Sequence, residues 1–113
     1  VAHLGRGVNA AGKLRVRESA ALLRHCSLYL GNDTGTMHLA AAVGVRCAAI
    51  FAAIDYPGRW TPFGTGHKIF RRSVECEGCH TPNCFNNNKC LREVMVDEVI
   101  EAANAILSSE KPL

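Results

Sequence analysis

The sequence predicts an α/β layered domain built on a parallel sheet, and three observations predict it. Two short apolar runs, at 27–31 and 47–53, are continuous rather than alternating, which is typical of parallel strands buried on both faces. An alanine-rich stretch over 34–43 lies between them and predicts a connecting helix. An amphipathic stretch near the carboxyl end predicts a helix that covers the sheet.

The composition is that of one globular domain. Of the 113 residues, 48% are apolar and 20% are charged, so we expect a single domain with its own core. The net charge of +3 is too small to imply nucleic-acid binding by itself. We expect neither a membrane-spanning segment nor a signal peptide, because the apolar runs are too short. Residue 1 is valine, and we expect the chain to be a piece of a longer protein.

The amino-terminal part is expected to contain one loop and one helix. Residues 1–14 are rich in Gly, Ala and Asn and predict a loop, with a strand remnant at its start as an alternative. Residues 17–26 contain helix formers followed by basic residues, which suit the negative end of a helix dipole.

The carboxyl-terminal part is expected to begin with a loop over 54–66, marked by its prolines and glycines. A third short strand is predicted over 67–71, and a cysteine- and asparagine-rich loop over 73–92. Six apolar residues then fall on one helical stripe: Val96, Val99, Ile100, Ala103, Ile106 and Leu107.

The turn between the first strand and the alanine-rich helix predicts an anion site. Gly31 and Gly35 let the backbone turn tightly, and the first N–H groups of a helix have no intrahelical acceptors. Thr34 and His38 stand four residues apart, on one face of the expected helix. Free amides, a hydroxyl and an imidazole near a helix N-terminus suit a diphosphate. The alternative is that Asp33 only caps the helix and His38 only packs.

The same segment, Asn-Asp-Thr-Gly-Thr-Met-His-Leu-Ala-Ala-Ala-Val-Gly at 32–44, closely resembles the signature of glycosyltransferase family 9, the heptosyltransferases of lipopolysaccharide core assembly. The resemblance extends to Asn-Ala-Ala-Gly-Lys-Leu at 9–14 and to the Pro/Trp loop at 55–62. It implies a Rossmann-like parallel sheet with flanking helices, the C-terminal half of a GT-B glycosyltransferase. Residues 1–113 would then be a partial nucleotide-sugar-binding domain, with the N-terminal acceptor domain absent.

The resemblance also implies roles for individual residues. The turn would hold the diphosphate and the near end of the donor sugar through Asp33, Thr34, Gly35 and Thr36. His38 would lie beside the phosphates, and Lys13 and Leu14 would border the adenine pocket.

The implied reaction is inverting transfer of heptose, or a related sugar, from an ADP-sugar to lipopolysaccharide core. The catalytic base and the acidic residue that grips the donor ribose would lie outside this chain, so no catalytic residue is expected in it. We expect weak donor binding without turnover, no required cofactor and no nucleic-acid partner. The resemblance implies a cytoplasmic location, with peripheral attachment to the inner membrane left open.

The cysteine loop permits a second hypothesis. Cys76, Cys79, Cys84 and Cys90 have a spacing close to that of a zinc knuckle, and four thiolates can form a structural zinc site. With nearby Lys and Arg, the alternative function is that of a small zinc-knuckle-like nucleic-acid-binding protein. Reduced thiols or a disulfide in a surface loop are the simpler interpretations.

Single residues outside these motifs can be assigned to the core, to a loop or to the surface. We expect Trp60 to pack beneath its loop, with ligand contact as the alternative, because a lone Trp usually supplies buried area. Arg59 faces either an anionic acceptor or solvent, and Arg46 is expected to be solvated. Cys26 and Cys47 are expected to be small buried hydrophobic residues.

Overall fold

The computed structural model describes residues 5–81 and 83–109; the strand remnant considered at the start of the chain falls largely outside them. The helices are α1 (Val16–Leu23), α2 (Gly35–Ala42), α3 (Lys89–Arg92) and α4 (Val96–Ser108). The strands are β1 (Tyr29–Asn32), β2 (Cys47–Phe51) and β3 (Lys68–Arg71). The predicted elements are present with small shifts at their ends, and α3 is a short helix that the sequence pattern did not predict.

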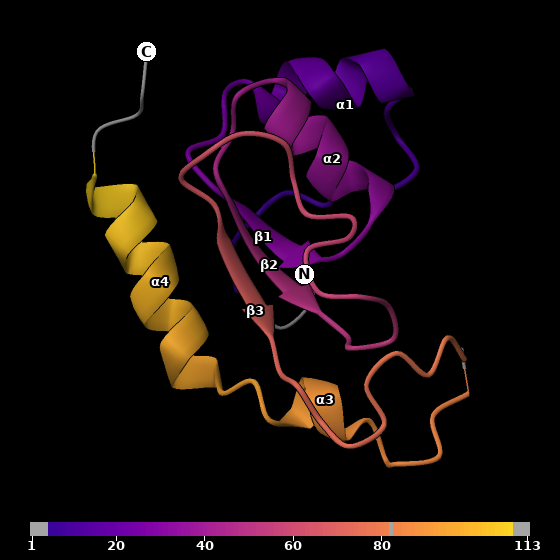
Figure 1. The fold of residues 1–113 in the computed structure, drawn as a ribbon. Coiled ribbons are helices and arrows are strands. Elements are labelled where there is room, and N and C mark those ends of the chain that lie inside the picture. Colours follow the sequence, from indigo (N-terminus) through magenta and orange to yellow (C-terminus); the bar gives the residue numbers. More distant parts are fainter. Residues whose placement is uncertain (1–4, 82, 110–113) are drawn as a thin grey trace.

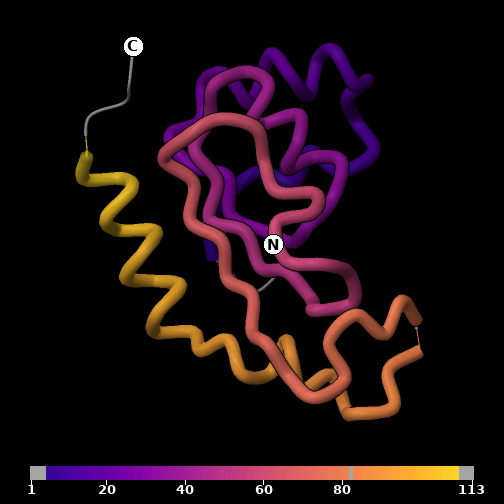
Figure 2. The backbone as a smooth tube through the Cα atoms, in the orientation of Figure 1, coloured from indigo at the N-terminus to yellow at the C-terminus, as the bar shows by residue number. Residues whose placement is uncertain are grey.

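The three strands form one parallel sheet with β2 in the middle, which confirms the predicted fold class (Figure 1). Because the strands are parallel, their carboxyl ends meet at one edge, where Asn32 of β1 stands opposite Ile50 of β2. The α4 helix lies on the opposite side of the sheet from α1 and α2. The chain between β3 and α4 makes a long excursion away from the sheet (Figure 2).

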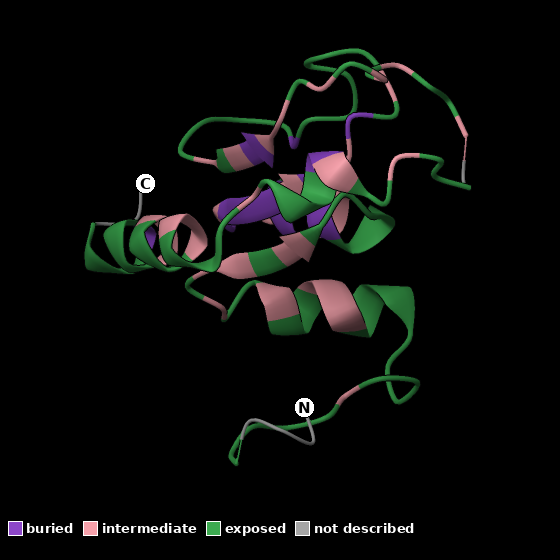
Figure 3. Cartoon of the chain, turned by 90° about the horizontal axis from the view of Figure 1, so that it is seen from below, coloured by how far each residue is buried: buried purple, intermediate pink, exposed green. Residues whose placement is uncertain are grey.

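The core is centred on β2 and α2, where the buried residues are concentrated (Figure 3). Met37 of α2 is fully buried against small residues of β2, Cys47 and Ala49, which allow the helix to approach closely. On the other face, Ile106 of α4 packs with Phe70 of β3. Complete burial of such side chains contributes about 1.5–3 kcal/mol each, so these contacts fix the sheet beneath its carboxyl edge.

Two expectations about packing need correction. The α2 helix is apolar along most of its length, yet Ala42 is exposed and Leu39 only partly buried. Arg46 is not simply solvated, because its guanidinium donates hydrogen bonds to Oγ of Ser109 at 2.5 Å and to the carbonyl of Ser109 at 3.2 Å. It therefore ties the start of β2 to the end of α4. Cys47 is buried as expected, whereas Cys26 is only half-buried.

The helices in the described ranges are all too short or too polar to cross a membrane.

Candidate functional site

The predicted turn lies directly after β1, at the carboxyl edge of the sheet, as expected from the sequence. The backbone N–H of Asp33 donates to the carbonyl of Ile50 at 3.3 Å, so the hydrogen bonding to β2 continues up to the first residue of the turn. Thr34 is extended, with φ −145°, and α2 begins at Gly35. Strand, turn and helix N-terminus are thus arranged as an anion site requires.

The N-terminus of α2 carries no side-chain cap. The hydroxyl of Thr34 instead lies 3.3 Å from the hydroxyl of Tyr29, within hydrogen-bond distance. The interpretation of Asp33 as a simple N-cap is therefore wrong for this structure. Without a cap, the N–H groups of Gly35 and Thr36 point out of the helix and can bind an external acceptor.

The surroundings of the turn shift the pKa of Asp33. Partial desolvation raises the pKa of Asp33, the imidazole of His38 lowers it, and the carboxylate of Asp55 raises it. These effects require the three side chains to share one neighbourhood at the sheet edge. The histidine is partly buried, while Asp33 remains exposed to a ligand.

An open groove of 630 Å³ lies between α2 and the start of α1. Its volume is within the range of roughly 300–1,000 Å³ typical of small-molecule sites. One wall contains Leu14, Val16 and Ser19, and the other is formed by residues of α2: Gly35, Thr36, His38, Leu39 and Ala42. The predicted Leu14 therefore lines the same groove as the predicted Gly35, Thr36 and His38.

Three of the predicted site residues do not line this groove: Lys13, Asp33 and Thr34. Lys13 is exposed beside Leu14, while Asp33 and Thr34 form the turn at the groove's end. The groove and the turn therefore make one continuous surface with an apolar part near Leu14 and a polar part near the helix N-terminus.

A second groove, of 520 Å³, lies between β3 and α4 and contains Lys68, Glu98 and Glu101 in its lining. It lies away from the carboxyl edge of the sheet and from the free amides of α2. The groove beside α2 is therefore the one that contains predicted site residues in its lining.

Asp55, in the loop after β2, organises a group of residues of which the sequence singled out only Arg59 and Trp60. Its Oδ1 accepts the backbone N–H of Tyr56 at 2.8 Å and the guanidinium of Arg59 at 3.3 Å. Its Oδ2 accepts the indole N–H of Trp60 at 3.2 Å. The hydrogen bond from Tyr56 is the main cause that lowers the pKa of Asp55, which keeps this carboxyl ionised.

Trp60 does not pack beneath its loop, because 56% of it is exposed. The expectation of a buried tryptophan is therefore wrong. Its backbone also has φ +66°, a left-handed conformation that costs a non-glycine residue about 1–2 kcal/mol. One signal could have identified this group: Asp55 lies in the loop after β2, and ligands bind at the carboxyl ends of such strands.

The cysteine loop is attached to the same edge of the sheet. The N–H groups of Gly78 and His80 donate to the carbonyls of Ala53 and Ile54, at 2.8 and 3.0 Å. The four cysteines of the cluster line a small cavity of 110 Å³, and all of them are free thiols. No three potential ligand side chains in the described part of the chain are close enough to hold a metal ion. Zinc binding by the four cysteines stays a hypothesis that the structure does not support.

The comparisons with known proteins agree on one family. The sequence profile of glycosyltransferase family 9 (heptosyltransferase) matches residues 1–108. The lipooligosaccharide heptosyltransferase 2 of Campylobacter jejuni is 26% identical over 102 residues, covering 89% of this chain and 32% of the relative. The lipopolysaccharide heptosyltransferase 3 of Escherichia coli K12 is 29% identical over 102 residues, covering 90% and 29%.

A shorter match, to the lipooligosaccharide heptosyltransferase 2 of Haemophilus influenzae, is 41% identical over 44 residues, 39% of this chain and 13% of the relative. No solved structure gives a significant match. The chain spans about a third of the length of the C. jejuni and E. coli relatives. The profile includes both the α2 turn and the cysteine loop. The chain belongs to glycosyltransferase family 9, the heptosyltransferases.

Proposed function

We propose that this chain is the donor-binding part of a glycosyltransferase that transfers heptose, or a related sugar, from an ADP-sugar to lipopolysaccharide core. The uncapped N-terminus of α2, which opens into the groove beside Leu14 and His38, is the observation that carries the proposal. The relatives' names, as heptosyltransferases of lipopolysaccharide or lipooligosaccharide, support the substrate class.

The proposed pose follows from the polarity of the surface. The adenine occupies the apolar part of the groove near Leu14, with Lys13 at its border. The diphosphate meets the N–H groups of Gly35 and Thr36, where the helix dipole stabilises an anion by about 0.3–1 kcal/mol at an exposed site. His38 donates a further hydrogen bond to a phosphate oxygen. Asp33 would repel a phosphate, so its carboxylate accepts a hydroxyl of the sugar instead.

The proposed reaction is an inverting displacement. A base outside this chain removes the proton of the acceptor hydroxyl, whose oxygen attacks the anomeric carbon as the bond to the nucleoside diphosphate breaks. Negative charge then builds on the departing diphosphate. The free amides at the start of α2 stabilise that charge, because they are already oriented toward it.

The remaining parts of the proposal concern the longer protein. In this proposal the chain is a partial C-terminal domain, and the acceptor domain and catalytic base lie outside it; the chain covers 32% and 29% of two relatives. The chain alone then binds donor without turnover. We place the enzyme in the cytoplasm, where a nucleotide sugar is available, and leave attachment to the inner membrane open.

Gly35→Ala tests the proposed phosphate site. A Cβ at this position would meet no atom within 4 Å and the backbone needs no positive φ, so the fold should tolerate the methyl group. That methyl group stands at the mouth of the free amides and hinders a phosphate. Calorimetric titration with ADP should show affinity reduced about tenfold, a loss of about 1.4 kcal/mol.

Asp97→Ala is the matched control, because Asp97 is an exposed residue in the first turn of α4, on the other side of the sheet. Its affinity for ADP should equal that of the wild type. Failure of the wild-type chain to bind ADP, or equal affinities of the wild type and Gly35→Ala, would contradict the proposal.

A further inference from the structure

The loop after β2 presents aromatic side chains to solvent beside the candidate donor site. Tyr56 is 64% exposed and Trp60 56% exposed, and the side chain of Arg59 is also exposed. Tyrosine and tryptophan are enriched where one face of the side chain meets a partner. We call Asp55, Tyr56, Arg59, Trp60 and His80 the Asp55 platform.

The exposed rings of the Asp55 platform are held in fixed positions. The Asp55 carboxylate binds both the indole N–H and the guanidinium, at 3.2 and 3.3 Å. The guanidinium carbon of Arg59 lies 5.4 Å from the centroid of the Trp60 ring. On the other side, Tyr56 meets His80 edge to face, with ring centroids 5.5 Å apart. Side chains that are ordered before binding lose less entropy when a ligand arrives.

The backbone of the Asp55 platform is strained at Trp60. Its φ of +66° is rare for a residue with a large side chain. Such strain persists where the surrounding structure enforces it, and it clusters at ligand-binding segments. The Trp60 ring is largely exposed, so burial of apolar surface does not account for the strain.

The chemistry of the Asp55 platform suits a sugar that carries a negative charge. The Arg59 guanidinium pairs with Asp55 through Nη1, but 53% of its side chain is exposed, so its other N–H groups can reach a ligand. A guanidinium can bind a phosphate or carboxylate through two parallel hydrogen bonds. The flat faces of Tyr56 and Trp60 match the apolar C–H face of a sugar ring.

The position of the Asp55 platform separates it from the nucleotide. None of its residues lines the groove beside α2. Asp55 lies in the loop after β2, and its carboxylate is near enough to Asp33, directly after β1, to raise the pKa of that residue. We propose that the Asp55 platform binds the anionic saccharide of the acceptor, an assignment that rests on the proposed transferase function.

Trp60 provides the test, because it is the only tryptophan of the chain and its fluorescence reports on the Asp55 platform alone. Glucose 6-phosphate should change the emission in a saturable way, with affinity at least about tenfold above that of glucose or inorganic phosphate, since ring and charge bind together. The change should persist in the presence of saturating ADP.

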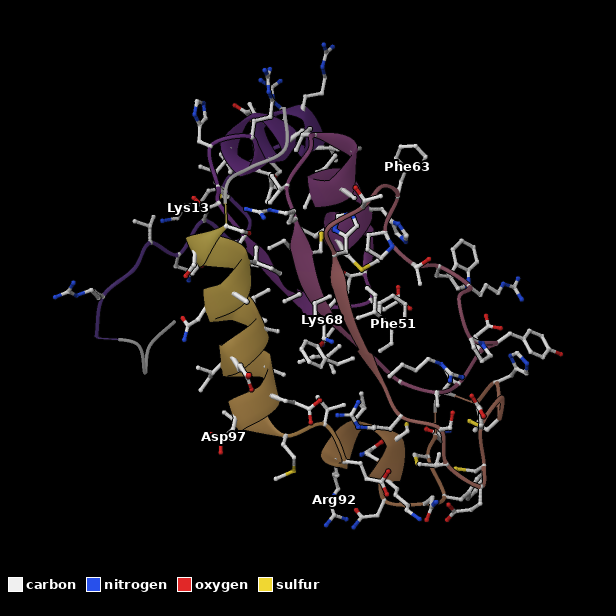
Figure 4. All side chains as sticks on the ribbon, turned by 60° about the vertical axis from the view of Figure 1, so that its left-hand side comes forward. Lys13, Phe51, Phe63, Lys68, Arg92 and Asp97 are labelled. Carbon is white, nitrogen blue, oxygen red and sulfur yellow. The ribbon has the colours of Figure 1, made fainter. Side chains whose placement is uncertain are left out.

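Two variants separate the contribution of the Arg59 charge from that of the Trp60 ring. Arg59→Gln should abolish the preference for glucose 6-phosphate over glucose. Trp60→Gly removes the ring and adopts φ +66° without strain, so it should weaken glucose 6-phosphate binding, measured by calorimetry, without lowering the melting temperature. The matched control is Phe63→Ala, because Phe63 is an aromatic residue of the same loop that is 86% exposed and projects outward (Figure 4). Its binding should be unchanged.

Three outcomes would overturn the assignment: no emission change with glucose 6-phosphate, equal binding of inorganic phosphate, or complete competition by ADP. The last would assign the Asp55 platform to the donor diphosphate. Binding of ADP without any response to glucose 6-phosphate would defeat this inference alone. Absence of ADP binding would defeat the proposed function, whatever the response of Trp60.

Discussion

At the scale of single residues, a few polar contacts determine how the loops leave the sheet. His67 is one of them, although no sequence motif marks it. Its Nδ1 accepts the backbone N–H of Cys47 at 3.0 Å, so its Nε2 carries the proton that is donated to the carbonyl of Phe63 at 2.8 Å. One imidazole therefore connects the start of β2 to the loop that also carries the Asp55 platform.

His67→Ala should destabilise the fold. The Cys47 amide, which starts the buried central strand, would lose its acceptor at a cost of about 1–3 kcal/mol. Thermal unfolding measures this loss. His67→Asn should recover part of it, because its side-chain oxygen can replace Nδ1, while His25→Ala, at an exposed position, should have little effect. Equal melting temperatures for His67→Ala and the wild type would show that this contact is not needed.

At the scale of elements, α4 is fixed to the sheet at both of its ends. At its start, Glu98 accepts the N–H of Met95 at 3.1 Å and pairs with Arg72, the residue after β3. At its end, Ser109 receives the hydrogen bonds of Arg46. Between these points Ile106 packs against the sheet. The helix therefore covers one face of β2 in a defined register.

The ion pair of Glu98 predicts a dependence of stability on pH. The hydrogen bond from Arg72 is the first cause that lowers the pKa of Glu98 below 4.5. Because the unfolded chain then binds more protons near that pH, the stabilisation is present above pH 4.5 and is lost as pH falls through the lower, folded pKa. Glu98→Gln should lose less stability on acidification than the wild type.

Denaturant unfolding between neutral pH and pH 3 or so measures this difference. Asp97→Asn, in the same turn but with its side chain exposed, should keep the acid sensitivity of the wild type. An identical acid dependence in Glu98→Gln and the wild type would contradict the role of this pair.

At the scale of the whole molecule, the parallel sheet and the α2 turn could be predicted, because both depend on local patterns. Continuous apolar runs identify β1 and β2, and Asp33 to His38 identify the turn. The Asp55 platform could not be found in this way, since its hydrogen bonds depend on where a loop folds back. The end of α1 was also misplaced: after Leu23, the N–H groups of His25 and Cys26 turn back to carbonyls three residues earlier, which closes the helix.

The fold as a whole places three polar segments at one edge of the sheet: the α2 turn, the Asp55 platform and the cysteine loop. The central claim is that the first of these binds the diphosphate of a nucleotide sugar. Amide NMR spectra of the ¹⁵N-labelled chain test it most directly, with titrations of ADP, AMP and adenosine. The Gly35 and Thr36 amides should shift strongly with ADP and weakly with adenosine; shifts confined to other residues, or equal for adenosine and ADP, would contradict diphosphate binding at this turn.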